Sequence, residues 1–374
     1  MAFAVLYLPL VEEFGAPRGD VALVQSAALL LGGCTGPIVG WGIDRLGPCR
    51  FFPGCALLAI VGLVLASRAH SLSALIFAYG VLGGLGLSGL GSQANMTVAA
   101  LWYPGARARA IAAVDLGTGF GAFAFIPLGQ LLLNSFGWQG ALLVWAGLLA
   151  VVVIPINLLQ RLPEHATTSA RGHERPSPAW TLRRALRTGA FWNLATSRWL
   201  SAMGFPLMNV HMVAFAVGAG VPAVQAAAAL GSVSLVSLPG RLATGWLADR
   251  IGRAPTLTIT YASAVAGIAC LAMLAWHGAH EWLIAYVLFY GLAQGSSGIV
   301  ASARTADVFA GPTFGTIYGW MSLAVGPGEA IGAWMGGAVF DRTGSYLAGF
   351  GFVATVLAAA LLLMWRVRPP RALR

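Results

Sequence analysis

The stretch "GWGIDRLGPCR" occupies residues 40–50, and a second charged turn, "GWLADRIGR", occupies residues 245–253. Both turns follow long apolar runs in a chain that is 58% hydrophobic and only 9% charged. The two copies share a glycine, a tryptophan, an aspartate–arginine pair and a second glycine in the same order. Two such turns, separated by more than half of the chain, indicate two copies of one structural unit.

The composition excludes an ordinary soluble domain, because such domains are about 25% charged. A bilayer must therefore replace water over most of the surface of this chain. The net charge of +10 does not indicate a nucleic-acid partner, because the arginines lie between apolar runs, as they do beside membrane-spanning helices. The four cysteines form no C-x-x-C pair, so we expect neither disulfides nor a metal site.

Apolar runs predict twelve helices, since about 20 apolar residues span the hydrocarbon core of a membrane. The first run is an exception, because it is interrupted at Glu12 and Glu13 and predicts only a short helix. The expected helices cover residues 1–11, 21–43, 51–67, 73–100, 110–133, 139–159, 191–216, 223–247, 255–276, 281–303, 314–339 and 345–365.

Six helices, a polar segment and six further helices predict an all-α integral membrane protein with two six-helix bundles. We expect an N-terminal bundle over residues 1–159, a cytoplasmic linker over 160–189 and a C-terminal bundle over 190–374. The two charged turns then follow the second helix of each bundle. The turn occurs twice because the bundle does.

All 22 basic residues are arginines, and their distribution predicts the orientation. With the linker in the cytoplasm, only Arg18, Arg68 and Arg342 lie in loops on the opposite side. Cytoplasmic loops carry an excess of basic residues, so we expect both termini and both charged turns to be cytoplasmic. The absence of lysine suggests a GC-rich bacterial genome, and hence the inner membrane of a cell.

Each shared position of the two turns has a physical reason. The first glycine permits close approach of a neighbouring helix, and the second permits a tight turn into the next one. The aspartate can accept hydrogen bonds from a nearby helix N-terminus, and the arginine can form a charge pair. A plain positively charged turn would explain either copy alone, but the repetition favours a cytoplasmic gate that latches helices in one conformation. The residues concerned are Gly40, Asp44, Arg45 and Gly47 in the first turn, and Gly245, Asp249, Arg250 and Gly252 in the second.

At these turns the chain resembles the major facilitator superfamily, whose signature turn follows the second and eighth helices. Other stretches are similar to its monocarboxylate transporter and oxalate/formate antiporter branch. The resemblance implies two six-helix bundles that enclose a central substrate site and open it alternately to each side of the membrane. The stretches are "PLVEEFGAPRGDV" (9–21), "LWYPGARARAIA" (101–112), "PGRLATGWLADRIGR" (239–253), "FGTIYGWMSLAVGPGEAIG" (314–332) and "FDRTGSY" (340–346).

Glycines recur at every fourth position in the second and eleventh expected helices, a pattern that permits close helix contact. The family resemblance implies that these two helices face each other between the bundles, so we expect the two stripes to meet there. Tight packing within one bundle is the alternative. The stripes are Gly32, Gly36 and Gly40, and Gly328, Gly332 and Gly336.

Arg241 is the first candidate for binding substrate. It lies eight residues before Asp249, roughly 12 Å into the membrane along the eighth helix. A guanidinium group matches a carboxylate with two parallel hydrogen bonds. The resemblance implies that an arginine at this place engages the substrate carboxylate, although a structural salt bridge is the alternative. Ser237 stands where animal monocarboxylate transporters carry an acid, and the lysines of the branch are missing, so proton coupling does not follow from the resemblance.

Two further ionisable residues lie within expected helices, where such residues are costly and commonly functional. Arg198 is expected at a depth similar to that of Arg241, where the two could bind a dianion; it could instead pair internally or extend to the interface. Glu329 lies near the middle of the eleventh helix. Burial disfavours the charged form of a carboxyl group, so Glu329 is the candidate for proton coupling, with a structural counter-ion as the alternative.

Polar residues of the fourth, seventh and tenth helices complete the expected cavity. His211, in the outer half of the seventh helix, is a candidate hydrogen-bond donor for gating. A helix–helix hydrogen bond explains any one of these residues equally well. They are Gln93, Asn95, Asn209, His211, Tyr290 and Gln294.

No metalloprotease motif, P-loop or nucleophile elbow is present, so the sequence does not predict an enzyme. It predicts a monomeric secondary active transporter, without cofactor or metal, for a small organic anion. A monocarboxylate is the favoured cargo, and coupling is to protons or by exchange. The alternatives are an exporter of a larger or neutral compound, a non-transporting sensor or membrane enzyme, and a non-functional carrier that starts at an internal Met1.

Overall fold

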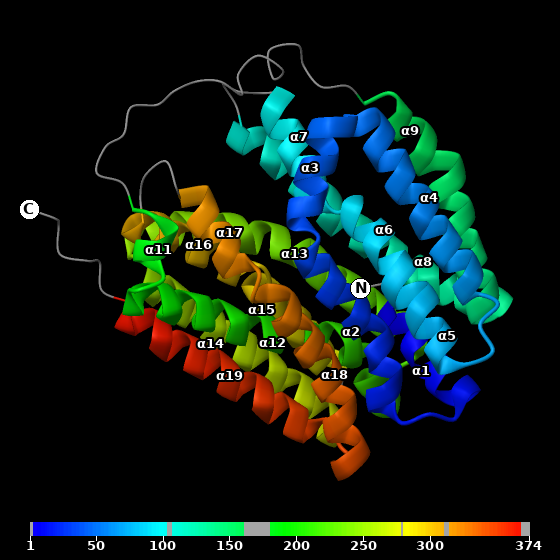
Figure 1. Ribbon diagram of the computed structural model, residues 1–374. Helices are drawn as coiled ribbons and strands as arrows, with labels where there is room; N and C mark the ends of the chain where they lie inside the picture. Colours follow the sequence, from blue (N-terminus) through cyan, green and yellow to red (C-terminus); the bar gives the residue numbers. More distant parts are fainter. Residues whose placement is uncertain (1–2, 103–106, 161–179, 278–279, 310–313, 368–374) are drawn as a thin grey trace, which may run out of the picture.

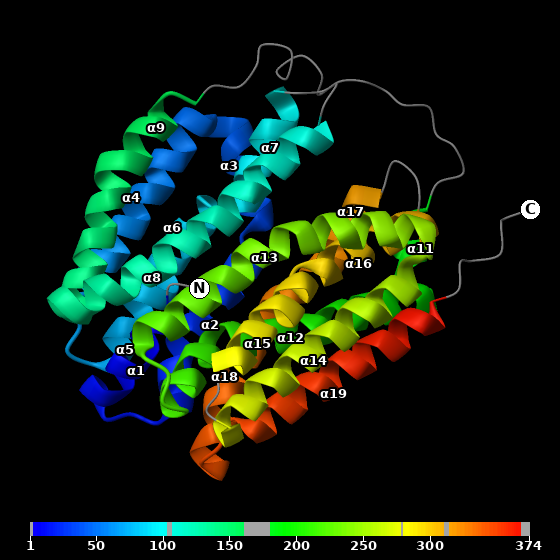
Figure 2. The same ribbon diagram turned by 180° about the vertical axis from the view of Figure 1, so that it is seen from behind.

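The computed structural model describes residues 3–102, 107–160, 180–277, 280–309 and 314–367. Every regular element in these ranges is a helix (Figures 1 and 2). Their order along the chain follows the expected apolar runs, so the prediction of an all-α membrane fold is confirmed.

The N-terminal half contains six membrane segments, several of which are broken into shorter helices. The second segment is broken at Thr35, where Pro37 follows at the start of the next helix. The fifth and sixth segments run together through Gly137, whose φ of 67° marks the bend between them. The elements are α1 (Phe3–Phe14), α2 (Arg18–Cys34), α3 (Gly36–Leu46), α4 (Pro48–Ala66), α5 (Leu72–Leu75), η1 (Ile76–Gly83), α6 (Gly84–Gly89), α7 (Ser92–Trp102), α8 (Arg107–Leu148), η2 (Leu149–Val153) and α9 (Ile154–Leu158).

The C-terminal half repeats this plan with fewer interruptions. Its tenth segment bends at Gly295, which has a φ of 87°, and its eleventh is broken between α17 and α18. The elements are α11 (Leu182–Ala185), α12 (Gly189–Gly218), α13 (Ala223–Arg250), α14 (Arg253–His277), α15 (His280–Ala293), α16 (Ser296–Val308), α17 (Phe314–Ser322), α18 (Val325–Thr343) and α19 (Leu347–Arg366).

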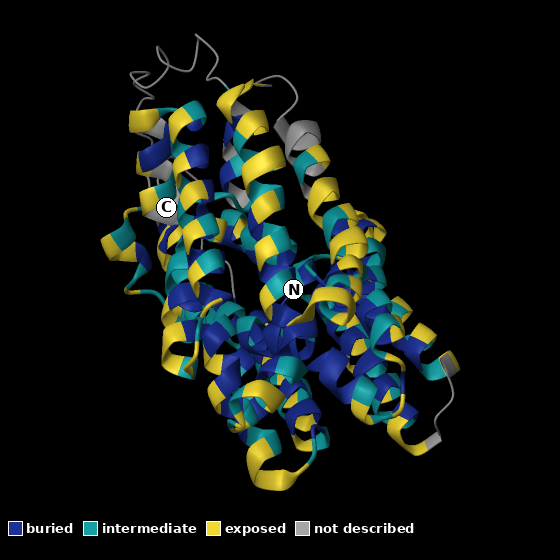
Figure 3. Cartoon of the chain, turned by 90° about the vertical axis from the view of Figure 1, so that its right-hand side faces the viewer, coloured by how far each residue is buried: buried dark blue, intermediate teal, exposed yellow. Residues whose placement is uncertain are grey.

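The surface of the helices is apolar. Eight stretches of the described chain are long and apolar enough to cross a membrane, and one of them, Leu116–Leu158, contains two of the expected helices. Large apolar side chains such as Leu57, Phe77 and Val151 are 55%, 57% and 75% exposed. Figure 3 shows exposed positions along the outward faces and buried positions where the helices converge. Such a surface is stable against lipid rather than water, so the chain is a multi-pass integral membrane protein.

The two ends of the molecule differ. We call the end where α9 ends and α12 begins the linker side, and the end where α2 begins and α18 ends the far side. On the linker side α3 packs chiefly against α2 and α4, and α17 against α11, α12, α16 and α18, so each stays with its own half. The halves therefore diverge toward the linker side and converge on the far side (Figures 1 and 2).

The halves meet where α2 packs against α18 and α8 packs against α13, with α1 lying against α12. The expected pairing of the second and eleventh segments is thus observed. Ser26 on α2 donates a hydrogen bond from its hydroxyl to the carbonyl oxygen of Ala330 on α18, at 2.8 Å. This bond crosses between the halves from the middle of α2 to the first third of α18.

The glycines at this interface are not those of the expected stripes. A Cβ atom added to Gly33 would lie 2.3 Å from the Cα atom of Gly326. One added to Gly337 would lie 2.5 Å from the carbonyl oxygen of Arg18, which begins α2. The halves therefore approach so closely because these positions carry no side chain.

The prediction that the stripes meet between the bundles is wrong, and the alternative of packing within one bundle holds for the described glycines. Their neighbours lie in their own halves, whereas the side-chain surroundings of Gly36 and Gly40 lie outside what the structure describes. Successive residues differ by about 100° around a helix, so a spacing of four identifies a stripe but not the helix that it faces. Gly32 packs against Ser88, Gly328 against Trp199, Gly332 against Met203 and Gly336 against His211.

We expect Gly33→Ala to lower the thermal unfolding midpoint of the purified protein. Its methyl group would overlap the backbone of Gly326, and such overpacking costs about 1–3 kcal/mol. Gly54→Ala in α4 is the matched control, because nothing lies within 4 Å of an added Cβ atom there. Since alanine favours helix, the control should melt no lower than the wild type. Equal midpoints for the two variants would contradict the tight interface.

Candidate functional site

Both charged turns place their second glycine in a left-handed conformation. Gly47, between α3 and α4, has a φ of 73°, and Gly252, between α13 and α14, has a φ of 95°. Other residues rarely adopt these values, so glycine is required for the tight turn that the sequence indicates. The repeat thus extends to the backbone of the two turns.

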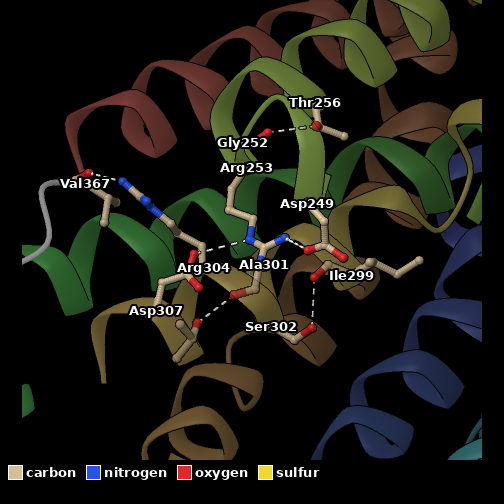
Figure 4. A network of polar contacts seen from close by, with 11 residues as sticks. Asp249, Gly252, Arg253, Thr256, Ile299, Ala301, Ser302, Arg304, Asp307 and Val367 are labelled. Atoms are coloured by element: carbon tan, nitrogen blue, oxygen red, sulfur yellow. Dashed lines mark hydrogen bonds and ion pairs between the residues drawn. The ribbon is translucent and has the colours of Figure 1, made fainter. Parts of the chain in front are cut away.

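The charge pairing of the second turn differs from the expectation. The Asp249 carboxylate accepts from the side chain of Arg253, at the start of α14, at 2.5 Å, and not from backbone N–H groups of a helix N-terminus. Arg253 also contacts Asp307, at the end of α16, at 3.2 Å (Figure 4). Nearby, Arg304 donates to the carbonyl oxygen of Val367, at 2.7 Å. The network ties the linker-side ends of α13, α14, α16 and α19 together within the C-terminal half.

The arginine that follows each aspartate stacks on tryptophan instead of forming the expected charge pair. The guanidinium carbon of Arg250 lies 4.3 Å from the ring centroid of Trp246, and that of Arg45 lies 5.8 Å from that of Trp41. Both pairs span one helical turn, so the stacking repeats with the sequence.

The remaining expectations concern the first glycine of each turn and Asp44, and the structure describes only some of these residues. No atom of the described residues lies within 4 Å of a Cβ atom built on Gly245, so none of the described helices approaches closely there in this conformation. The surroundings of Gly40 and the side chain of Asp44 are not described. A latch between the halves at the first turn stays a prediction.

A cavity of about 130 Å³ lies between the two halves, at the level where they converge. The N-terminal half contributes residues of α1 and α2, and the C-terminal half contributes residues of α12 and α18. Most of the wall is apolar, and three polar side chains interrupt it. The lining residues are Phe3, Ala4, Gln25, Leu29, Pro206, Asn209, Val210 and Glu329.

Glu329 is the acidic group of this cavity. Within the described chain its carboxylate has no hydrogen-bond or ion-pair partner, but the charge of Arg198 acts on it from α12. Arg198 donates from Nη1 to the hydroxyl of Tyr318 on α17, at 2.7 Å, and its guanidinium carbon lies 4.9 Å from that ring centroid. Arg198 therefore points inward, toward the region of Glu329, and not out to the membrane interface.

A side chain of the tenth segment, Gln294, orients the amide of Asn209. Gln294, in the bend between α15 and α16, donates from Nε2 to Oδ1 of Asn209, at 3.1 Å. The Asn209 amide thus faces the cavity with its oxygen already engaged. Tyr290 lies deeper, fully buried against Tyr286 with ring centroids 5.1 Å apart, and it is not among the cavity residues.

Arg241 lies against the bend between α15 and α16 and is not among the lining residues of the cavity. Its Nε atom lies 2.4 Å from where a Cβ atom on Gly295 would be, so its side chain crosses the bend that carries Gln294. The absence of a side chain at Gly295 leaves the space that Arg241 fills. The structure thus places Arg241 and Arg198 on the same half, and the charge of Arg198 acts on Glu329.

Asn95 and His211 lie apart from the cavity. The side chain of Asn95 donates to the carbonyl oxygens of Leu90 and Gly91, at 2.9 and 3.1 Å, where α6 gives way to α7. His211 is fully buried, with Nε2 at 2.7 Å from the carbonyl oxygen of Ala333. In this conformation neither residue is among the lining residues of this cavity.

His211 is part of a cluster that closes the far side. Its ring packs between Tyr7 and Tyr346, with centroid distances of 4.8 and 5.4 Å. The hydroxyl of Tyr7 donates to the carbonyl oxygen of Arg18, at 2.8 Å, and Arg18 donates from Nη1 to the hydroxyl of Tyr346, at 2.6 Å. The cluster joins α1 and α2 of one half to α12 and the start of α19 in the other.

Asp341 completes this far-side cluster. Its two carboxylate oxygens accept from the backbone N–H groups of Arg18 and Gly19, at 2.9 and 2.7 Å. A residue of the C-terminal half therefore caps the N-terminus of α2, a helix of the other half. Such caps are charge-assisted and favourable.

A family model described as Major Facilitator Superfamily matches residues 1–288. The chain belongs to the major facilitator superfamily. Two curated relatives cover nearly the whole of this superfamily member. Monocarboxylate transporter 13 of Rattus norvegicus is 29% identical over 367 residues, which are 97% of this chain and 82% of the relative. Monocarboxylate transporter 4 of Rattus norvegicus is 26% identical over 375 residues, covering 97% and 78%. This major facilitator protein is a secondary transporter and not an enzyme.

Solved structures of the superfamily share the fold. A mutant of the nucleoside transporter NupG matches with a TM-score of 0.78 at 14% identity, over 96% of this chain and 94% of NupG. The xylose transporter XylE from E. coli, in a partially occluded inward open conformation, matches with a TM-score of 0.73 at 13% identity, over 98% and 95%. At such identities the likeness concerns the fold alone.

Several residues of this transporter's site carry no distinctive sequence signal. Gln25 is a single amide in an apolar helix. Tyr318 and Asp341 lie in stretches that carry the family resemblance, but the resemblance gave neither of them a role. The contacts of these residues reveal what they do. Among the described residues, no group of three or more His, Cys, Asp or Glu side chains could hold a metal ion.

We expect Asp341→Asn to shift this transporter toward opening on the far side. Asparagine keeps one acceptor oxygen but loses the charge, and loss of a helix cap costs about 0.5–2 kcal/mol. The measurement is the distance between spin labels at Ala16 and Ser345, where the longer distance should gain population several-fold. Asp20→Asn is the control, because Asp20 lies in the first turn of the same helix. An unchanged distance distribution in Asp341→Asn would exclude the cap as a seal.

Proposed function

We propose that this transporter carries a small organic anion, with a monocarboxylate as the favoured cargo, by alternating access. The supporting observation is the cavity of about 130 Å³ between the halves, with Glu329 in its wall and Arg198 acting on that group. The names of the curated relatives support a monocarboxylate.

We assign the cargo carboxylate to Arg241. Its side chain crosses the bend beside Gln294, whose amide orients Asn209 at the cavity wall. A small anion in the cavity would contact Asn209 and would engage Arg241 by exchanging with the partner that Arg241 has in this conformation. The other arginine, Arg198, would balance Glu329 when that residue is ionised.

Glu329 is the proposed proton-coupling group. It faces a cavity whose wall is mostly apolar, and the charge of Arg198 acts on it, so its protonation would depend on what else is bound there. A proton on Glu329 would leave Arg198 free to attract a second anionic group. Proton symport and anion exchange both follow from this arrangement, depending on whether Glu329 releases its proton together with the cargo.

The alternating motion is proposed to break the far-side cluster and close the linker side. The cluster of Tyr7, Arg18, His211, Asp341 and Tyr346 joins the two halves on the closed far side, so its contacts would have to separate for that side to open. We propose that the linker side is cytoplasmic, in the inner membrane, because the excess of arginine lies there. This conformation would then be open to the cytoplasm.

The direct test is uptake into proteoliposomes of radiolabelled acetate, propionate, lactate and pyruvate, with and without a pH gradient. We expect saturable uptake of at least one acid and none of it in protein-free vesicles. Stimulation by a pH gradient would indicate proton coupling, and stimulation by internal carboxylate would indicate exchange. Failure to move any acid would contradict the proposal and favour the export of a larger or neutral compound.

A further inference from the structure

The two halves contribute unequally to the cavity. The C-terminal half supplies Asn209 and Glu329, and the arginines assigned to cargo and counter-charge belong to it as well. Among the described lining residues, the N-terminal half supplies apolar side chains and a single polar one, Gln25. The side chain of Gln25 has no hydrogen-bond partner among the described residues, so both ends of its amide are available to cargo.

We propose that Gln25 is the N-terminal half's polar contact with cargo, and that it makes the switch between the two open states depend on bound cargo. This inference rests on the proposed transport function and assigns a residue of the same site. The ligand group that it requires is a carboxylate or hydroxyl oxygen placed between α2 and the C-terminal half.

The requirement for such a contact is thermodynamic. A ligand shifts a conformational equilibrium only if it binds one state more tightly than the other. Cargo held by the C-terminal half alone would keep the same contacts as that half moves, and would shift nothing. A contact with α2 exists only while the two halves are close together around the cargo.

An apolar wall cannot provide this dependence. Phe3 and Leu29 can pack against Pro206 and Val210 whether or not cargo is present. An amide behaves differently, because burying it without a hydrogen-bond partner costs free energy. Gln25 is only partly buried in this conformation, so water can satisfy its amide. Occlusion of a cavity without cargo would remove that water and leave the amide unsatisfied, whereas occlusion around cargo would replace the water with a hydrogen bond.

The position of Gln25 suits this role. Its neighbour, Ser26, donates across the interface to the carbonyl oxygen of Ala330, at 2.8 Å, and Ala330 follows Glu329. Gln25 and Glu329 thus lie on either side of a hydrogen bond between the halves, and both face the cavity. A small anion between them touches both halves at the point where they meet.

The experiment compares loaded with empty switching in Gln25→Leu, which removes the amide but keeps a side chain of similar length. Using the labelled acid that the wild type moves fastest, one measures exchange between cargo on both sides and net efflux into cargo-free buffer. Equilibrium dialysis of the purified protein gives the Kd for the same acid. Gln139→Leu, at an exposed position of α8, is the matched control.

We expect wild-type exchange to be at least tenfold faster than net efflux, and this ratio to fall at least fivefold in Gln25→Leu. The Kd should change less than threefold, because the charged groups are intact, and retained exchange shows that the variant folds. A wild-type ratio of one, an unchanged ratio in Gln25→Leu, or a Kd raised more than tenfold would overturn the inference. A wild type that moves none of the acids contradicts the proposed function, and this inference with it. A transporting wild type with an unaffected variant contradicts only the role of Gln25.

Discussion

Carboxylate uptake by Arg241→Ala is expected to fall at least a hundredfold, while the protein still inserts and purifies as the wild type does. Removing one partner of a buried charge pair costs about 3–5 kcal/mol, and about 1.4 kcal/mol corresponds to a factor of ten. The measurement is initial uptake of the labelled acid at a concentration below saturation. The loss should be specific to anions if Arg241 binds the carboxylate.

The control for this variant is Arg366→Ala, at an exposed position at the end of α19. It removes an arginine of equal charge from the same half and should transport at the wild-type rate. Arg198→Ala separates the two arginines of the site, since Arg198 is assigned to Glu329. Wild-type uptake by Arg241→Ala, together with loss of uptake in Arg198→Ala, would transfer the carboxylate site to Arg198.

Glu329→Gln is expected to abolish the stimulation of uptake by a pH gradient and to leave exchange within about threefold of the wild type. Glutamine resembles the protonated carboxyl group in shape, so cargo can still bind, but no proton can be released. The measurement is uptake with the external medium more acidic than the lumen, compared with counterflow at equal pH. Loss of exchange as well as of pH stimulation would assign Glu329 to cargo binding instead.

Two controls support this reading. Glu281→Gln changes an exposed acid at the start of α15 and should keep the pH stimulation of the wild type. Glu329→Asp keeps the titratable group on a shorter side chain and should recover part of it. If Glu329→Gln responds to the gradient as the wild type does, proton coupling does not pass through this residue.

The charged turns and the ionisable residues show which features could be predicted from the sequence and which could not. The repeated turns indicated two bundles, and the observed positive φ of Gly47 and Gly252 follows from the same residues. The ionisable residues within apolar helices were also visible in the sequence, because a charge in such a run is conspicuous. The partners of these residues were not visible in the sequence. The prediction that Asp249 accepts from backbone N–H groups was wrong, because its carboxylate pairs with the side chain of Arg253.

The helix rotations explain the other error. Sequence spacing showed that one face of the second and eleventh segments is rich in glycine. Gly33 and Gly337 each lie one residue, about 100° around the helix, from a stripe glycine, and they are the ones that face the other half. Side-chain packing over the whole interface sets that rotation, and no local pattern contains it.

By itself the sequence determined the membrane environment, the two-bundle fold and the places where charge enters the apolar helices. These follow from composition and periodicity, which act on each segment independently of the others. Only the tertiary structure decided that Gln25 shares a cavity with Glu329, that Gln294 orients Asn209, and that Asp341 caps α2. Each of these contacts joins segments far apart in the chain. It depends on the relative orientation of the packed helices and on their offset along the membrane normal.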